Sequence, residues 1–266
     1  MRISEVSSAK IRDISVQASR SLDDFPYISD VVEAYNNTVY DEFETSLVLS
    51  RGFLTVPYEF LPLGHQEYAK RRASDAGLID LLKGSTPVNT LVATKGRLTS
   101  WSSVYDSKDH MAIPLLSEEF VDSLPMIAHL LRALGLTQEW KNSDSFISQR
   151  STVKHQVGYL CIEDPLNDLD DQGRRIVPDT QFIEDFGVRS VFAIAGTVFG
   201  GSKLILTFFS KDPVDARSIQ TLLPLINYLK SIIVPRCSIT RVFNPPKCEC
   251  PGDEPKSANQ ITGARS

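Results

Sequence analysis

The sequence predicts an α/β fold of the α+β type, in which helices flank a central antiparallel sheet. Three observations lead to this prediction. Apolar residues recur at helical spacing near both ends of the chain, β-branched and aromatic runs occupy the middle, and a Gly-Gly pair separates two of those runs. With 266 residues, of which 42% are hydrophobic and 23% charged, the chain can bury a substantial core.

Two amphipathic helices are expected in the first part of the chain. Apolar residues recur there at steps of three and four between residues 11 and 43, and Phe25-Pro26 breaks the pattern. The run from 46 to 61 then has the β-branched, turn-interrupted composition of a strand and its continuation. A helix is expected to follow near residues 66 to 82.

A second pair of extended segments is expected between residues 89 and 104. Lys95-Gly96 would form the turn between them, which places Trp101 on the second arm.

A capped helix is predicted to begin after Ser117. The hydroxyl of this residue and the carboxylates of Glu118 and Glu119 suit the positive end of a helix dipole. The apolar pattern continues to Gly135, and Pro125 is expected to kink the helix or split it in two.

The next segments predict a strand, a loop and a short helix. The strand is expected over residues 153 to 162, and Glu163 to Arg175 form an Asp-rich loop. The helix is expected to start at Pro178-Asp179, run to Phe186 and stop at Gly187 in the left-handed conformation.

A β-hairpin and a long helix follow. The hairpin arms are residues 189–199 and 203–210, joined by a turn at Gly200-Gly201. Asp212 and Pro213 are expected to open the last helix, which Pro235 ends. The chain therefore divides into an N-terminal helical extension (1–29), one domain (30–235) and a flexible, disordered C-terminal tail (236–266) with little apolar surface.

Charge and composition argue against nucleic-acid and membrane partners. The formal net charge is −5, and the one basic run, Lys70 to Arg72, is flanked by acidic residues. No secretory signal or apolar run of about 20 residues is found, and the cysteines are few and scattered. These features predict a cytoplasmic protein.

The chain resembles a known class of bacterial signalling module. The segment 109–136 looks like a distinctive part of GAF-related input domains of bacterial multidomain histidine kinases and cyclases, and the junction 186–191 and the strand 204–211 resemble the same module. The resemblance covers residues 30 to 235. It implies a GAF-like central antiparallel sheet, a sensory or regulatory role, a small-molecule ligand, and a histidine kinase or cyclase as partner. No such output domain follows in this sequence.

The candidate ligand-binding residues are Trp101, His155, Cys161, Phe182 and Arg189. Arg189 would either face a ligand or pair with Glu184 or Asp185. Cys161 invites comparison with bilin-binding GAF domains, but Ile162 stands where those domains usually place a histidine, so a small buried core residue is favoured.

No metal motif is recognised, and no cofactor is assigned. No two histidines share the i, i+4 spacing of a helical metal site. The acidic loop lacks the glycine and glutamate spacing of a calcium loop. Cys248 and Cys250 are two thiols without further ligands, which favours an inert tail over a redox or metal site.

Three hypotheses about function follow. The first is a non-catalytic sensor that binds a small ligand between the sheet and residues 155–186. The second is an interaction protein with a filled pocket that acts as a homodimer through its terminal helices, which an exposed apolar stripe on helix 11–24 or 213–234 would favour. The third, an enzyme, requires His110, His155, Cys161 and the acidic loop to converge in space.

Overall fold

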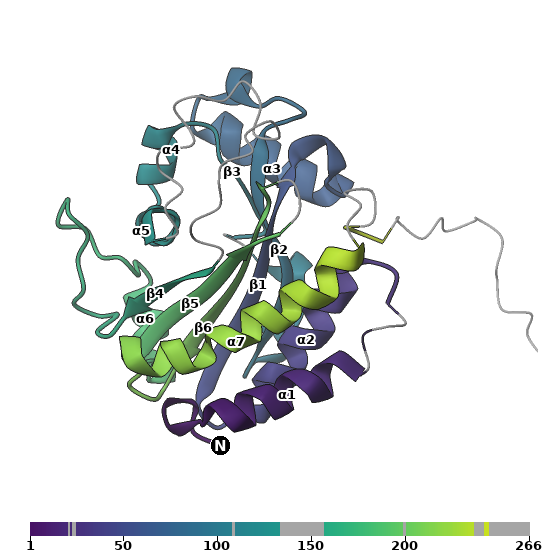
Figure 1. The fold of residues 1–266 in the computed structure, drawn as a ribbon. Coiled ribbons are helices and arrows are strands. Elements are labelled where there is room, and N and C mark those ends of the chain that lie inside the picture. Colours follow the sequence, from purple (N-terminus) through teal and green to yellow (C-terminus); the bar gives the residue numbers. More distant parts are fainter. Residues whose placement is uncertain are drawn as a thin grey trace, which may run out of the picture.

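The chain forms a six-stranded antiparallel sheet with helices on both faces (Figure 1). The computed structural model describes residues 1–20, 22, 25–107, 110–133, 157–198, 201–236 and 242–244. The strands are β1 (Leu47–Pro57), β2 (Pro87–Gly96), β3 (Ala112–Pro114), β4 (Val157–Ile162), β5 (Ser190–Thr197) and β6 (Lys203–Ser210). They lie in the order β3-β2-β1-β6-β5-β4, so that β1 and β6 are the central pair. The expected antiparallel sheet is confirmed.

The helices form two unequal layers on this sheet (Figure 1). The described helices are α1 (Ser8–Arg20), α2 (Ile28–Glu42), α3 (Leu63–Asp75), α4 (Glu118–Asp122), α5 (Pro125–Ala133), α6 (Thr180–Phe186) and α7 (Ala216–Ile233). Helices α2 and α7 lie against one face with α1 packed beside them, and we call this the α7 face. Helices α4, α5 and α6 cover the opposite face, which we call the α5 face.

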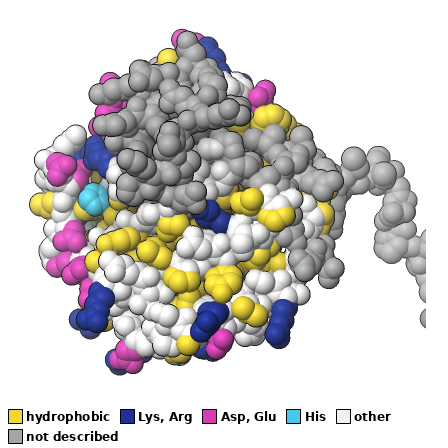
Figure 2. All heavy atoms as spheres, in the orientation of Figure 1, with side chains coloured by type: hydrophobic (Ala, Val, Ile, Leu, Met, Phe, Trp, Pro, Cys, Tyr) yellow, Lys and Arg dark blue, Asp and Glu magenta, His cyan; other side chains and the backbone are white. Residues whose placement is uncertain are grey.

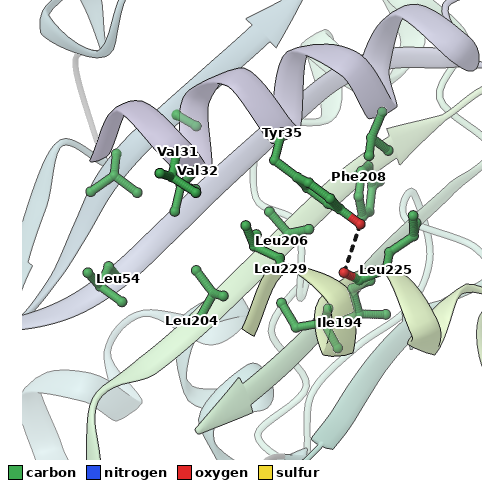
Figure 3. Close-up of a cluster of buried hydrophobic side chains, with 14 of the residues drawn as sticks. Val31, Val32, Tyr35, Leu54, Ile194, Leu204, Leu206, Phe208, Leu225 and Leu229 are labelled. Carbon is green, nitrogen blue, oxygen red and sulfur yellow. Dashed lines mark hydrogen bonds between the residues drawn. The ribbon is translucent and has the colours of Figure 1, made fainter. Parts of the chain in front are cut away.

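The largest cluster of buried side chains fills the α7 face. Figure 3 shows Tyr35 of α2 reaching across it, and the Tyr35 hydroxyl donates to the carbonyl oxygen of Leu225 at 2.9 Å. The same hydroxyl lies 3.2 Å from Oγ of Ser15, so one side chain links α1, α2 and α7. Burial raises the pKa of Tyr35, which keeps the phenol neutral and able to donate.

Several local predictions are confirmed by the backbone. Ser117 caps α4, accepting from the backbone N–H of Phe120, and the predicted helix is split in two at Pro125. Asp179 caps α6, which ends at Gly187 with φ +64°. The predicted hairpin is the β5–β6 pair. The ends of two predicted elements, residues 153–156 and 134–135, lie outside the described residues, as does Gly200.

The predicted extended pair over residues 89–104 is wrong in its second arm. Strand β2 ends at Gly96, and Trp101 then lies on a one-turn 3-10 helix, Thr99–Trp101. The strand that pairs with the outer edge of β2 is β3, which follows further along the chain. A Cβ atom at Gly96 would lie 2.7 Å from Cε3 of Trp101, so the absence of a side chain at Gly96 lets the indole lie against the strand end.

Two predicted helix boundaries also differ from the structure. Helix α3 ends at Asp75 rather than Leu82, because Gly77 has φ +68° and turns the chain away. Helix α7 begins at Ala216, and its cap is Asp215, whose carboxylate accepts from the N–H of Ser218. Asp212, the predicted cap, instead accepts from the hydroxyl of Ser46 at 2.7 Å.

The terminal segments lie against the body of the domain. Ile11 and Ile14 of α1 are buried in the same cluster as the apolar residues of α7, so the stripes of both helices face the core. In the predicted tail, Val242 is 1% exposed and its carbonyl oxygen accepts from the N–H of Ser29 at 2.9 Å. The tail is therefore anchored at Val242, whereas the division at residue 29 stays a prediction.

His65 of α3 is a buried titratable side chain beside this anchor. Its ring lies 5.6 Å from that of Phe243 and 5.7 Å from that of Tyr105, between centroids. Burial lowers the pKa of His65, which outweighs the opposing effect of the Leu91 carbonyl group. The imidazole is therefore neutral in the folded chain at a pH where the unfolded chain already binds a proton.

We expect the free energy of unfolding to fall as the pH is lowered from 7 to 5. The unfolded state takes up a proton at His65 near pH 6.5, and the folded state does so only at lower pH, so stability is lost through that window. One proton changes the slope by at most about 1.4 kcal/mol per pH unit. Urea denaturation of the wild type and His65→Phe at several pH values measures this. Equal slopes for the two proteins would contradict a buried neutral His65.

Candidate functional site

A row of three polar side chains crosses the middle of the α5 face. Arg51 of the central strand β1 pairs in register with Thr94 of β2 and with Thr207 of β6. Neighbouring strands are about 4.8 Å apart, so the three residues lie side by side. We call Thr94, Arg51 and Thr207 the polar row. The rest of the face is mostly apolar, including Phe53 and Ile205 in the next row.

The neighbours of Arg51 show why its side chain projects toward α5 rather than α2. Ser50 hydrogen bonds to Asn36 of α2, and a Cβ atom at Gly52 would lie 2.9 Å from Cγ1 of Val32 in the same helix. Successive side chains of a strand point to opposite faces, so Arg51, between these two residues, faces away from α2. The strand pattern thus places a permanent positive charge, half-buried, at the centre of the sheet.

His110 extends the polar row from the loop before β3. Its Nδ1 atom lies 3.4 Å from an Nη atom of Arg51. A guanidinium group has no acceptor, so Nδ1 of His110 is the acceptor in a hydrogen bond between these two atoms.

An aromatic cluster stands at one end of the same face. The Trp101 ring lies 5.5 Å from that of Phe182 and 4.7 Å from that of Phe186, and Phe182 contacts Phe209 of β6 at 5.4 Å, all between ring centroids. The backbone carbonyl of Trp101 accepts from the hydroxyl of Thr94 at 2.8 Å. This hydrogen bond connects the aromatic cluster to the polar row.

A second polar pair lies further along the α5 face. Thr55 of β1, four residues after Arg51, pairs in register with Asn89 of β2. Asn89 is 2% exposed, and its Oδ1 atom has no hydrogen-bond partner among the described residues. A buried acceptor without a donor is costly, so a group on the α5 face that donates to Asn89 would stabilise the domain.

The five predicted ligand-binding residues do not form one site. Trp101 and Phe182 are in contact on the α5 face. Cys161 packs on the α7 face, because alternate residues of β4 point to opposite faces and Leu160 and Ile162 take the α5 side. His155 lies outside the described residues.

Arg189 lies at the surface, directly before β5. Its side chain is exposed, and no ion pair joins it to Glu184 or Asp185, all three of which are described. Its backbone N–H donates to the carbonyl oxygen of Ser210 at 2.7 Å. The predicted pairing with Glu184 or Asp185 is therefore not observed, and the ligand-facing alternative stays a prediction.

Cys161 lies in a setting that disfavours the thiolate. Its Sγ atom is 3.5 Å from the carbonyl oxygen of Val214 and 3.9 Å from a carboxylate oxygen of Glu163. Burial, followed by the charges of Glu163 and Asp215, raises the pKa of Cys161 to about 11. The thiolate is the reactive form of cysteine, so this residue is a poor nucleophile.

We expect Cys161 to alkylate slowly. At pH 8 a thiol with this pKa is about 0.1% ionised, whereas an unperturbed cysteine with pKa near 8.5 is about 24% ionised, so iodoacetamide should modify Cys161 at least 10-fold more slowly than the same residue in the urea-unfolded chain. Peptide mass spectrometry over time measures both rates. Equal rates in the folded and unfolded chain would show that the thiol is not protected.

Arg51 is not among the residues predicted to bind a ligand, although the sequence contains a signal for it. Arg51 is the only charged residue between Ser46 and Tyr58, a run that is otherwise apolar or uncharged. Burying a charged side chain in a central strand is costly unless other groups pair or hydrogen bond with it, so a single arginine in such a run indicates a polar site.

Among the residues that the structure describes, no group of three His, Cys, Asp or Glu side chains is placed to hold a metal ion.

Figure 2 shows the side chains on one side of the molecule, coloured by type. Among the described residues visible there, acidic and basic side chains are interspersed with hydrophobic ones. None of the described helices is both long and apolar enough to cross a bilayer.

Comparison with known proteins gives structural matches only. No family model and no curated protein sequence matches the chain. Among solved structures, the phycoerythrobilin-bound GAF domain from a cyanobacterial phytochrome is 11% identical, with a TM-score of 0.43 over 87% of this chain and 97% of that one. A phycocyanobilin-bound GAF domain from a cyanobacterial phytochrome is 12% identical, with a TM-score of 0.44 over 87% and 96%.

A third match is the GAF domain from Acinetobacter phosphoenolpyruvate-protein phosphotransferase. It is 12% identical, with a TM-score of 0.39, over 84% of this chain and 91% of that one. The observed antiparallel sheet, with α1, α2 and α7 gathered on one side, agrees with the arrangement that the sequence resemblance implied.

Proposed function

We propose that this chain is a non-catalytic sensory or regulatory domain that binds a small molecule on the α5 face. The observation that carries the proposal is Arg51, a half-buried guanidinium group in the middle of an otherwise largely apolar sheet face. A few convergent polar groups in apolar surroundings are typical of small-molecule sites. His110, the Asn89 amide and the hydroxyls of the polar row supply such groups here.

The geometry favours a binding role over a catalytic one. An enzyme assembled from His110 and Cys161 would need both side chains on one face, but His110 meets Arg51 on the α5 face and Cys161 packs toward α7. The raised pKa of Cys161 also disfavours a nucleophilic role.

Helix α7 is the proposed route from the ligand to a partner. It packs against β4 and β5, whose other face belongs to the α5 side, and against α1. A ligand signals only if it binds two arrangements of the domain unequally, so it must prefer one position of α7 relative to the sheet. The partner proposed is a bacterial histidine kinase or cyclase, in the cytoplasm.

The alternative proposal is an interaction protein that acts as a homodimer. Its expected signature was an exposed apolar stripe on a terminal helix, but the apolar stripes of α1 and α7 are buried in the core. Val16 of α1 is 40% exposed, but one exposed apolar residue does not form a stripe. The ligand-binding proposal is therefore preferred.

A thermal-shift screen of the purified chain against a metabolite and metal library tests the proposed function. We expect at least one compound to raise the melting temperature, since a ligand that binds only the folded state must stabilise it, and native mass spectrometry should show the same complex. Thr207→Val keeps the shape of the polar row without its hydroxyl and should reduce the shift. Thr38→Val, on α2, is the matched control and should keep it. No stabilising compound, or equal shifts in both variants, would contradict binding on the α5 face.

A further inference from the structure

We infer that the ligand of the α5 face presents an uncharged amide or lactam edge, an N–H group beside a carbonyl oxygen, to Asn89. The inference rests on the proposed function and names the class of chemical group that binds at this end of the face. Asn89 of β2 is 2% exposed, and its Oδ1 atom has no hydrogen-bond partner among the described residues. A buried acceptor is costly unless a donor reaches it, so this oxygen points to a group that binds there.

The strand pattern turns Asn89 toward the α5 face. Val88, the residue before it, packs in the cluster of the α7 face, whereas Leu91 packs in the cluster of the α5 face. Successive side chains of a strand alternate, so Asn89 shares the side of Leu91. Thr55 of β1 is the partner of Asn89 in register and follows Leu54, which faces α7. The Asn89 amide and the Thr55 hydroxyl therefore lie side by side on the α5 face.

The polar groups of this pair suit an amide. A carboxamide carries an acceptor, Oδ1, and a donor, Nδ2, on the same carbon, so it can pair at once with the N–H group and the carbonyl oxygen of a second amide. A rotation of 180° about the last torsion of Asn89 exchanges the two atoms, and an amide edge pairs with either orientation. Thr55, 3% exposed, makes no side-chain hydrogen bond to a described residue, so its hydroxyl offers a third polar contact.

The surroundings of Asn89 on the sheet favour an uncharged group. Asn89 pairs in register with Thr55 on one side and with Ile113 of β3 on the other, and none of these side chains is ionisable. The next pair toward the polar row, Phe53 and Leu91, is apolar. A buried ion needs a counter-charge beside it, so a neutral amide is favoured here over a carboxylate or an ammonium group.

The same neighbours supply contacts for an apolar body. Ile113 belongs to a cluster with Ile127 of α5, whereas Phe53 and Leu91 belong to the cluster that includes Leu130 of α5. The polar pair thus lies between two apolar clusters, both of which contain side chains of α5. A ring that carries the amide would bury its surface against these side chains, which adds to the affinity.

Matched probes with and without the N–H group test the inference. We would measure dissociation constants and melting temperatures of the wild type with benzamide against acetophenone, in which a methyl group replaces the NH2 group, and with 2-pyridone against N-methyl-2-pyridone. The N–H member of each pair is expected to bind. Its counterpart should bind at least about 10-fold more weakly, because it leaves Oδ1 of Asn89 without a donor. Equal affinities within both pairs would overturn the inference.

Asn89→Leu removes the amide with little change in side-chain size. We expect this variant to bind benzamide at least about 10-fold more weakly than the wild type does, and to bind benzamide and acetophenone about equally. Thr90→Val is the matched control, because Thr90 is the next residue of β2, is fully buried and faces α7 as Val88 and Val92 do. This control should keep the preference for benzamide. An unchanged preference in Asn89→Leu would overturn the inference.

A second measurement needs no variant. The side-chain NH2 resonances of Asn89 in the wild type should shift with benzamide and much less with acetophenone. If circular dichroism shows that Asn89→Leu is unfolded, this measurement replaces it, and NH2 resonances that benzamide leaves unmoved would overturn the inference.

The outcomes separate the two proposals. Benzoate should bind more weakly than benzamide, and tighter binding of benzoate would overturn the uncharged edge and leave ligand binding in place. A library compound that binds wild type and Asn89→Leu alike has the same meaning. A chain that binds no probe and no library compound overturns both proposals.

Discussion

Replacing Phe208 with alanine is expected to destabilise the domain by about 3–5 kcal/mol. Phe208 is fully buried on the central strand β6 and stacks on Phe192 with 5.0 Å between ring centroids. Figure 3 places it among the side chains that join α2 and α7 to the sheet, so its removal opens a cavity in the largest cluster. In a domain of this size the melting temperature should fall by about 10 °C.

Calorimetry of Phe208→Ala and of Phe60→Ala measures this effect. Phe60 is 39% exposed, so the same deletion there should cost well under half as much. Similar losses at both positions would show that Phe208 is not the centre of the core.

Gly52→Val is the second large effect, with an expected cost of about 3 kcal/mol or more. A Cβ atom at Gly52 would lie 2.9 Å from Cγ1 of Val32 and 3.1 Å from Cβ of Ala93. Val32 is β-branched and has one preferred rotamer on a helix, so it cannot move aside without shifting α2. The contact explains why a glycine is required in the middle of a central strand.

Chemical denaturation of Gly52→Ala and Gly52→Val gives a graded test. The alanine variant should lose less than the valine variant, because it adds only the clashing Cβ atom. Gly64→Val is the control for adding a side chain in place of glycine, since a Cβ atom at Gly64 would have no neighbour within 4 Å. An unchanged midpoint for Gly52→Val would contradict the close approach of α2 to the sheet.

Local signals predicted most of the fold, and contacts between distant segments account for the errors. The cap at Ser117, the break at Pro125 and the left-handed Gly187 act within a few residues, so sequence alone located them. The path of the chain after Gly96 depends on the packing of Trp101 against Phe182 and Phe186. These two residues belong to α6, which follows β3 and β4 in the sequence. No local pattern contains that information.

The candidate site was less predictable for a related reason. Trp101 and Phe182, two of the predicted ligand-binding residues, share a face. Cys161 lies on the other face, because strand alternation assigns a residue to one of two faces and the sequence alone does not say which one. Predicting the polar row requires the register of β2, β1 and β6, and only the folded sheet gives that register.

Methyl NMR of the chain with the most strongly stabilising library compound tests ligand binding on the α5 face most directly. Ala193, Ile205 and Thr207 present methyl groups to the α5 face, whereas Ile194 and Leu206, their neighbours on the same strands, face α7. The compound should shift the first three sets of resonances and leave the other two nearly unchanged. Shifts centred on Ile194 and Leu206, with Thr207 unmoved, would contradict a ligand site on the polar row.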